Sequence, residues 1–170
     1  YINIFCYLSI LIYQNRNSFK GGEIFEVKLK GAMEVEASNS KITHPIVIGT
    51  DTLPFNTLEL GGEINLRVPR FVTPFPRLGK KSNNAKTNFM STYNYQLRFA
   101  FERSISNLSF GYSWKETVTK QHVINPMEFN LVNINITDTN LMNAIQGSKD
   151  LFLKNSYSDH FTLGSRYAFI

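Results

Sequence analysis

The chain has 170 residues, of which 42% are hydrophobic and 18% are charged, and this balance excludes a disordered or fibrous protein. Its 14 Phe, 8 Tyr and 1 Trp suit β-strands and the aromatic girdles of membrane barrels better than a helical bundle. The formal net charge of +5 comes from Lys and Arg residues scattered among 13 acidic residues. No basic stripe forms, so the charge does not indicate nucleic-acid binding.

The N-terminal region and the cysteine content exclude several further classes. The single cysteine, Cys6, rules out an internal disulfide, a CxxC redox motif and a cysteine-built metal site. An apolar run from Tyr1 to Tyr13 lacks the charged region and the small-residue cleavage site of a secretory signal. No apolar run reaches the roughly 18 residues of a membrane-spanning helix. The abrupt ends of the sequence indicate a fragment of a longer protein.

The first half of the chain alternates between apolar and polar residues. Residues 1–16 are rich in β-branched and aromatic residues and predict a strand, and the turn that follows carries Asn17 and the pair Gly21–Gly22, which tolerate a positive φ. From Glu23 to Glu36, apolar residues at odd positions alternate with charged residues at even positions, which predicts a second strand. Strands of soluble proteins usually have about 5 to 6 residues, whereas about 9 to 11 cross a bilayer. The length of this alternation therefore predicts a membrane barrel.

The remaining chain repeats this pattern. Residues 37–56 predict a long loop, and a third strand extends from Leu58 to Pro69, which removes a ladder donor. Residues 71–86 form a proline-rich loop. Three further segments alternate over 87–103, 107–115 and 160–169, the first two joined by a tight hairpin near Glu102–Ser104. Before the last of these segments, residues 121–136 predict a strand with a bulge or a sheet edge at Asn125–Pro126. Residues 137–155 predict a short loop helix capped by Asp138 or Thr139.

We therefore predict an all-β fold in which residues 1–170 form part of an antiparallel transmembrane β-barrel, as an open curved sheet of about seven strands. A soluble lipocalin-like barrel would show the same period, so alternation alone leaves that alternative open. The long strands, the aromatic residues near strand ends and the mixed charges on the glycine-bearing face favour a water-lined lumen. The convex face is expected to carry the apolar set: Phe25, Val27, Leu29, Leu58, Leu60, Ile64, Phe89, Tyr93, Leu108 and Phe110.

No group of residues indicates catalysis, a cofactor or a metal. The three histidines, His44, His122 and His160, lie far apart without ligand spacing. Ser158, Asp159 and His160 are consecutive, and neighbours in a strand point to opposite faces, so they cannot form a relay among themselves. A hydrolase embedded in the barrel would need a Ser, a His and an acid on one face, and none is seen.

Two other patterns have simpler explanations than chemistry. The glycine pairs Gly21–Gly22 and Gly61–Gly62 lack the Lys-Ser/Thr of a phosphate loop and suit turns or close packing. Four acids could pair for catalysis, but basic residues lie between them, which favours a charge-neutralised lumen wall over an enzyme. The acids are Glu26, Glu34, Glu59 and Glu63, and the basic residues are Lys28, Lys30 and Arg67.

Five phrases follow one another along the chain: Asn15–Glu23, Glu59–Phe71, Lys86–Arg98, Phe110–Lys115 and Asn125–Asn130. In this order they resemble the Bacteroidetes branch of the BamA/TamA superfamily, the bacterial surface antigen family of outer-membrane barrels. The first phrase resembles the turn between early barrel strands of that family. The resemblance covers most of the chain from Asn15 to Phe169. It does not include the POTRA domains, the closing strands or the Arg-Gly-Phe/Tyr element of the lumen loop, so no functional residue carries over.

The resemblance implies a protein of the outer membrane of a Gram-negative cell that inserts barrel proteins or translocates substrates. Its implied partners are outer-membrane lipid, unfolded outer-membrane or secreted client proteins, and periplasmic or lipoprotein partners. Insertion would use the barrel seam to template an incoming strand by backbone hydrogen bonds. The alternatives are a passive outer-membrane pore and a soluble lipocalin-like binding barrel.

Overall fold

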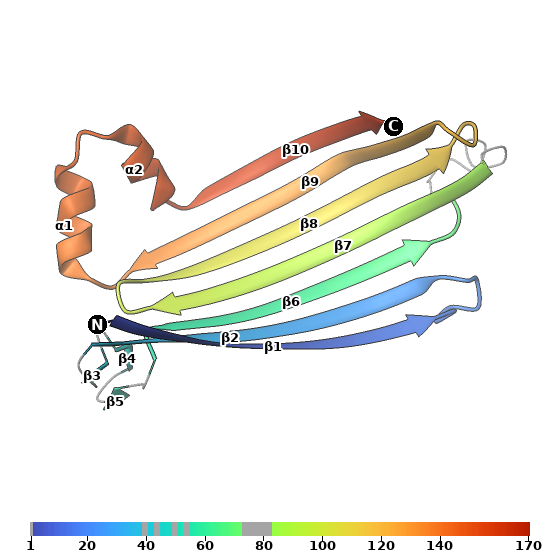
Figure 1. Ribbon diagram of the computed structural model, residues 1–170. Helices are drawn as coiled ribbons and strands as arrows, with labels where there is room; N and C mark the ends of the chain where they lie inside the picture. The colour runs from blue at the N-terminus through green and yellow to red at the C-terminus, as the bar shows by residue number, and fades with distance from the viewer. Residues whose placement is uncertain (1, 39–40, 43–44, 49–50, 53–54, 73–82) are drawn as a thin grey trace.

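The computed structural model describes residues 2–38, 41–42, 45–48, 51–52, 55–72 and 83–170. Seven long strands form one antiparallel sheet in the order β1-β2-β6-β7-β8-β9-β10, and β3 pairs with β2. The short strands β4 and β5 form a separate pair. Figure 1 shows the long strands as one open layer, with β1 and β10 at opposite edges. The prediction of an antiparallel all-β sheet with seven strands is confirmed.

The elements have the following bounds. The long strands are β1 (Ile2–Arg16), β2 (Ile24–Ser38), β6 (Thr57–Val68), β7 (Asn83–Arg98), β8 (Phe101–Lys115), β9 (Gln121–Ile136) and β10 (His160–Phe169). The short strands β3 (Lys41–Ile42), β4 (Val47–Ile48) and β5 (Asp51–Thr52) lie in the predicted long loop. Two helices, α1 (Thr139–Gly147) and α2 (Leu151–Ser156), connect β9 to β10. No helix among the described residues is long and apolar enough to cross a membrane.

The connections follow local side-chain chemistry. Helix α1 begins after Asp138, whose side chain accepts a hydrogen bond from the backbone of Asn140, so the predicted cap is confirmed. Helix α2 was not predicted, and it is capped in the same way by Asp150. The turns after β1 and β8 lie at one end of the sheet, and the helices and the β7–β8 turn lie at the other (Figure 1).

A tight hairpin joins β7 and β8, as predicted, but its predicted position near Glu102–Ser104 is wrong. The chain turns at Phe99–Ala100, because β7 ends at Arg98 and β8 begins at Phe101, and Leu97 pairs with Glu102. This turn contains no Gly, Pro, Asn or Asp to mark it in the sequence. Phe99 also continues the pattern of apolar residues at odd positions, so the predicted strand extends beyond the end of β7. Strand β7 also begins earlier than predicted, at Asn83, within the expected loop 71–86.

The bulge predicted at Asn125–Pro126 is confirmed. Phe110 pairs with Met127 and Tyr112 pairs with Ile124, so two residues of β9 lie opposite the single residue Gly111 of β8. The register of β9 against β10 shifts at the same level. Because of the bulge, apolar residues on both sides of it occupy one face of the sheet.

The apolar side chains share one face, as predicted, and that face is exposed. Cross-strand pairing aligns Phe25 with Leu66, Leu66 with Phe89 and Phe89 with Phe110. Five side chains at the centre of this face are about half exposed: Leu29 (52%), Leu60 (50%), Ile64 (48%), Tyr93 (51%) and Leu108 (53%). The buried hydrophobic residues of the described chain are few: Ile46, Val68, Leu97, Ala100 and Ile145.

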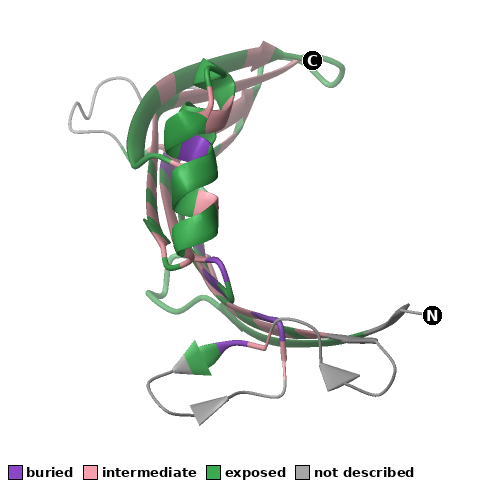
Figure 2. Cartoon of the chain, turned by 90° about the vertical axis from the view of Figure 1, so that its left-hand side faces the viewer, coloured by how far each residue is buried: buried purple, intermediate pink, exposed green. Residues whose placement is uncertain are grey.

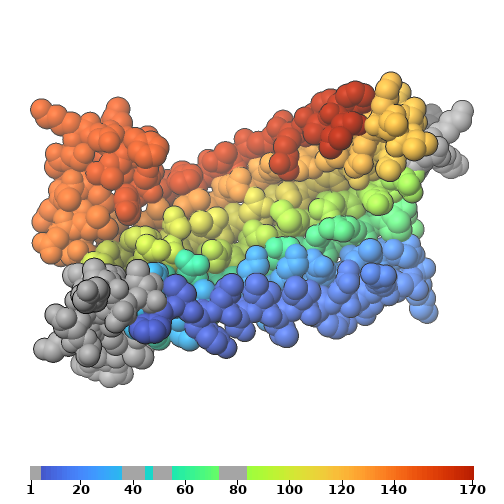
Figure 3. All heavy atoms as spheres, viewed as in Figure 1, coloured from blue at the N-terminus to red at the C-terminus, as the bar shows by residue number. Residues whose placement is uncertain are grey.

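The opposite, polar face lies on the concave side of the sheet. Figure 2 shows the sheet as a curve with the helices on its inner side. Tyr157, which follows α2, packs edge-on against Phe101 with ring centroids 5.8 Å apart, and Phe101 belongs to the polar-face positions of β8 by alternation. In the space-filling view of Figure 3, helix atoms gather at one end while the middle strands remain uncovered on this face. The convex face is therefore the apolar one.

Candidate functional site: the polar face of the sheet

Charged side chains of β2 and β6 pair on the concave face. The Lys28 ammonium lies 2.9 Å from a carboxylate oxygen of Glu26 and 2.8 Å from one of Glu63. Lys28 and Glu63 are directly opposed in the register, which explains the contact. Lys30 lies 3.9 Å from the other oxygen of Glu63 and is more exposed. The group contains two lysines and two glutamates, so its charges cancel.

A second group crosses β6, β7 and β8. Glu59, Gln96 and Arg103 are aligned by pairing, and Gln96 donates to Glu59 through its amide nitrogen. The guanidinium of Arg103 donates to the amide oxygen of Gln96 over 2.8 Å. Gln96 is only 5% exposed, so both ends of its amide are used where water has little access. The Gln96 amide thus connects Glu59 to Arg103 through two hydrogen bonds.

A third group surrounds the bulge. The amide nitrogen of Asn125 donates to Glu128 over 2.6 Å, and the guanidinium of Arg166 on β10 donates to the same oxygen over 2.9 Å. The bulge turns Asn125 toward this face beside Glu128. The edge strand is therefore attached to β9 by an ion pair as well as by its backbone ladder.

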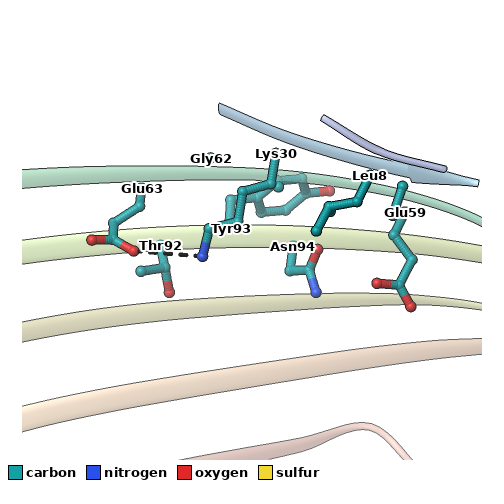
Figure 4. Close-up of a pocket in the computed structure, with 10 residues that line it drawn as sticks. Leu8, Lys30, Glu59, Gly62, Glu63, Thr92, Tyr93 and Asn94 are labelled. Atoms are coloured by element: carbon teal, nitrogen blue, oxygen red, sulfur yellow. Dashed lines mark ion pairs between the residues drawn. The ribbon is translucent and has the colours of Figure 1, made fainter. Parts of the chain in front are cut away.

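A shallow groove of about 300 Å³ lies over β2, β6 and β7 on this face. Figure 4 shows the carboxylates of Glu59 and Glu63 with Thr92 and Asn94 along it, and the dashed ion pair from Lys30 to Glu63. Gly61 forms part of its floor, where an added Cβ atom would lie 3.3 Å from the amide oxygen of Asn94. This lining provides hydrogen-bonding groups, but it places no nucleophilic side chain beside a histidine that could act as its base.

Several buried polar atoms on the strands find no protein partner. Among the described residues these are Asn65 Oδ1, Asn88 Oδ1, Arg103 Nε and Asn107 Oδ1. Buried polar atoms without a partner are costly unless water reaches them. All four belong to polar-face positions of β6, β7 and β8 by alternation, so this face suits contact with water.

Strand β1 departs from the two-faced pattern. Its pairing with β2 places Leu8, Ile10 and Ile12 opposite Ala32, Lys30 and Lys28, which puts these apolar side chains on the polar face. They are 65%, 51% and 57% exposed, respectively. Tyr7 and Leu11 lie on the other face, so β1 is apolar on both sides. Within the described chain, β1 pairs only with β2 and β10 pairs only with β9.

The turn between β1 and β2 is held by its own polar groups. The side-chain oxygen of Asn17 accepts from the backbone of Gly22 over 2.9 Å, and the carboxylate of Glu23 accepts from the backbone of Gly21 over 2.9 Å. Asn17, Lys20 and Gly22 have positive φ values of 69°, 60° and 76°. The predicted turn chemistry is therefore confirmed at Asn17 and Gly22.

Glu23, the acid at the end of this turn, is buried, with 2% of its surface exposed. Hydrogen bonding by its own backbone N–H, and further by that of Gly21, holds the pKa of the carboxyl below its ordinary value. Arg70, whose guanidinium lies 3.6 Å from the carboxylate, acts in the same direction. This contact connects the turn to the chain just after β6.

The candidate catalytic and metal residues are not brought together. Asp159 accepts from the backbone N–H of Ile134, and the hydroxyl of Ser158 donates to the backbone oxygen of Asn155, so neither side chain hydrogen-bonds to His160. The Nδ1 atom of His160 lies instead 3.0 Å from the backbone oxygen of Ser158. No cluster of metal-ligating side chains occurs in the described chain, and His44 lies outside the described residues. His122 lies instead in an aromatic cluster, which its position in the sequence did not reveal.

No protein-family model matches the chain, and neither the curated proteins nor the solved structures contain a significant match.

Proposed function

We propose that this chain is part of a transmembrane β-barrel of the Gram-negative outer membrane. The observation that carries the proposal is the separation of the two faces across the middle of the sheet, from β2 to β8: the convex face is apolar and exposed, while the concave face pairs its charges. In a membrane barrel the outward face meets lipid and the inward face lines water. A lipocalin-like binding barrel needs the reverse arrangement, with apolar side chains inside.

Within that setting we propose a BamA/TamA-like role in inserting outer-membrane proteins or translocating substrates. Support comes from the family resemblance of the Asn15–Glu23 turn and from the edge strand β1. Its backbone N–H and C=O groups are paired on one side only in the described chain. An incoming client strand could add to such an edge by backbone hydrogen bonds, without any bond-breaking chemistry.

The natural cysteine provides a direct test of client contact at β1. Cys6 is exposed and lies on this edge strand. The protein in liposomes would be offered an unfolded outer-membrane protein carrying single cysteines along its last strand. Disulfide formation at successive client positions two residues apart is expected for strand addition. Cys6→Ser with Ser148→Cys, in the α1–α2 connection, is the matched control and should give no such ladder. Equal cross-linking at both sites would reject templating by β1.

A passive outer-membrane pore is the second candidate, and the charge-lined concave face favours it. The two functions differ in their dependence on clients. Steady ion conductance of the reconstituted protein, unchanged by unfolded client and by cross-linking at Cys6, would favour the pore. Client insertion that stops when Cys6 is cross-linked would favour the assembly role.

A further inference from the structure

A polar groove interrupts the apolar face of the sheet at the end that carries the helices. It has a volume of about 320 Å³ and crosses β7, β8, β9 and the residue before β10. We call it the outer groove, and its members at convex-face positions are Tyr95, Glu102, Ser104, Asn133, Asn135 and Asp159. Pairing brings them together, because Ser104 lies between Tyr95 and Asn133, and Glu102 lies opposite Asn135.

The outer groove offers hydrogen-bonding groups without a positive charge of its own face. Arg103 and Ile134 also border it, but they belong to concave-face positions by alternation. The guanidinium of Arg103 is used on that face, where it donates to Gln96. The groove therefore presents carboxylate, amide and hydroxyl groups. This chemistry does not suit a phosphate or another anionic ligand, which would need a basic partner.

The boundary between the apolar and polar parts of the convex face runs obliquely across the strands. One paired row begins with apolar residues on β2, β6 and β7 and continues with polar residues on β8 and β9. Its members are Met33, Leu58, Leu97, Glu102 and Asn135. Strands of membrane barrels are tilted by about 35–45°, so a membrane plane crosses paired rows obliquely. Glu102 and Asn135 would then lie outside the hydrocarbon while Met33 remains within it.

The outer groove begins where the apolar residues of β9 end. Asn133 and Asn135 follow Leu131 on the same face, about 7 and 13 Å farther along the strand at about 3.3 Å per residue. A tilt of about 40° reduces these distances to about 5 and 10 Å along the membrane normal. The polar layer on each side of the hydrocarbon is about 5 to 8 Å thick. The groove therefore opens into the headgroup layer and the water beyond it.

We propose that the outer groove binds a neutral saccharide, either the sugar of a glycolipid headgroup or a free sugar. This inference rests on the proposed membrane location. The hydroxyl groups of a saccharide both donate and accept, and so do the amides of Asn133 and Asn135 and the hydroxyl of Ser104. The two acids are oriented by neutral donors, since Glu102 is hydrogen-bonded to the Tyr95 hydroxyl and Asp159 accepts from a backbone N–H. Their remaining acceptor sites can take further hydroxyl groups.

The side of the groove toward β6 suits the apolar part of a sugar ring. Tyr95 pairs with Leu60, and Leu97 pairs with Leu58, so the lining becomes apolar in that direction. A saccharide can place its C–H face over the Tyr95 ring and direct its hydroxyl groups toward the asparagines. The volume lies near the lower end of the roughly 300–1,000 Å³ of small-molecule sites, which suits a mono- or disaccharide.

A maltosyl lipid with a photoreactive diazirine on its sugar tests this inference. The protein would be reconstituted into phosphatidylcholine vesicles containing this lipid and illuminated, and mass spectrometry of its peptides would locate the attached sugar. Attachment is expected on β8 and β9, around Ser104 and Asn133. Asn133→Ala/Asn135→Ala should lower it at least about tenfold, because two hydrogen bonds to the sugar are lost. Thr162→Ala removes an exposed polar group from the concave face of β10 and should leave attachment unchanged.

Free maltose separates the two sources of the sugar. Competition by excess maltose would show that the groove accepts a free saccharide, whereas attachment that resists maltose would assign the groove to a lipid-borne sugar. Either result supports the proposal. Equal attachment of a phosphocholine lipid with the same diazirine in its headgroup would overturn it, and so would attachment that Asn133→Ala/Asn135→Ala does not reduce.

A third lipid, with the diazirine at the end of its acyl chain, separates this inference from the proposed location. It should label the convex face near Leu60 and Tyr93, where a membrane barrel meets hydrocarbon. Labelling there without sugar attachment in the outer groove would reject the saccharide site and leave the membrane location standing. If the acyl-chain probe does not label the convex face, the membrane location itself fails, and this inference fails with it.

Discussion

The side-chain amide of Asn125 lies directly against the Cα atom of Gly111, across the β8–β9 pair. An added Cβ atom on Gly111 would overlap the amide oxygen of Asn125 and would lie 3.2 Å from the backbone oxygen of Ile124. The contact arises from the bulge, which turns Asn125 toward Gly111 while its amide nitrogen donates to Glu128. Glycine at position 111 is therefore required by packing, not by an unusual φ.

Gly111→Ala should lower the free energy of unfolding by about 1–3 kcal/mol, the usual cost of forcing a methyl group into an occupied site. Gly164→Ala on β10 is the control, because nothing lies within 4 Å of a Cβ atom added to Gly164. The control should be neutral or slightly stabilising, since alanine suits a strand better than glycine. Reversible urea unfolding of the reconstituted protein measures both variants. Similar costs at the two positions would contradict the packing explanation.

The paired charges of the concave face make a second prediction. Lys28 lies 2.8 Å from Glu63, whereas Lys30 lies 3.9 Å away and is about half exposed. A double-mutant cycle with Lys28→Met and Glu63→Gln should therefore give a larger coupling energy than one with Lys30→Met and Glu63→Gln. Both couplings should weaken as the salt concentration rises. A larger coupling for Lys30 would show that the observed pairing does not persist in solution.

The positions of the strands could be predicted from the sequence where the alternation of apolar and polar residues is clear. Alternation located the long strands after β1, because apolar and polar residues alternate along the chain, as they do from Phe25 to Glu36. Strand β1 is apolar on both faces, and it was predicted from its β-branched and aromatic residues instead. It failed at the Phe99–Ala100 turn, where no residue with turn chemistry interrupts the apolar pattern. The missed α2 is only six residues long, too short for periodicity to reveal.

The side-chain contacts between strands could not be predicted from the alternation of residues. Lys28 and Glu63 meet because the register of β2 against β6 places them opposite each other, and that register depends on the whole connection between the strands. His122 joins Trp114 and Tyr167 only because the bulge at Asn125–Pro126 returns β9 to the apolar face. The sequence indicated the bulge but not which rings it would bring together.

A third prediction concerns acid sensitivity of the β1–β2 turn. The pKa of Glu23 is held below its ordinary value of 4.5, first by hydrogen bonding of its own backbone N–H. Because the folded pKa is depressed, the carboxylate stabilises the fold fully above about pH 4.5 and loses this contribution as the pH falls through the folded pKa. The unfolding free energies of wild type and Glu23→Gln should therefore converge on acidification.

Arg70→Met separates the causes of that shift. The backbone donors act more strongly than Arg70, so this variant should retain most of the acid-dependent loss seen in wild type. Unfolding curves recorded at closely spaced pH values between neutral and acid conditions measure all three proteins. Parallel pH profiles for wild type and Glu23→Gln would show that the carboxyl group of Glu23 contributes no such stabilisation.

The last prediction compares the two faces of the sheet at neighbouring positions of one strand. Tyr93 is 51% exposed on the convex face, and Asn94 is exposed on the concave face. If the convex face meets hydrocarbon, Tyr93→Arg should cost roughly 2 to 4 kcal/mol near the midplane, whereas Asn94→Arg should cost well under that amount because its charge remains in water. Leu60→Arg and Glu59→Arg repeat the comparison on β6, although an arginine at position 59 also loses the hydrogen bond from Gln96. Reversible unfolding from lipid bilayers measures the four variants. Equal costs for Tyr93→Arg and Asn94→Arg would mean that no gradient from lipid to water crosses this sheet, and the proposed outer-membrane location would then be withdrawn.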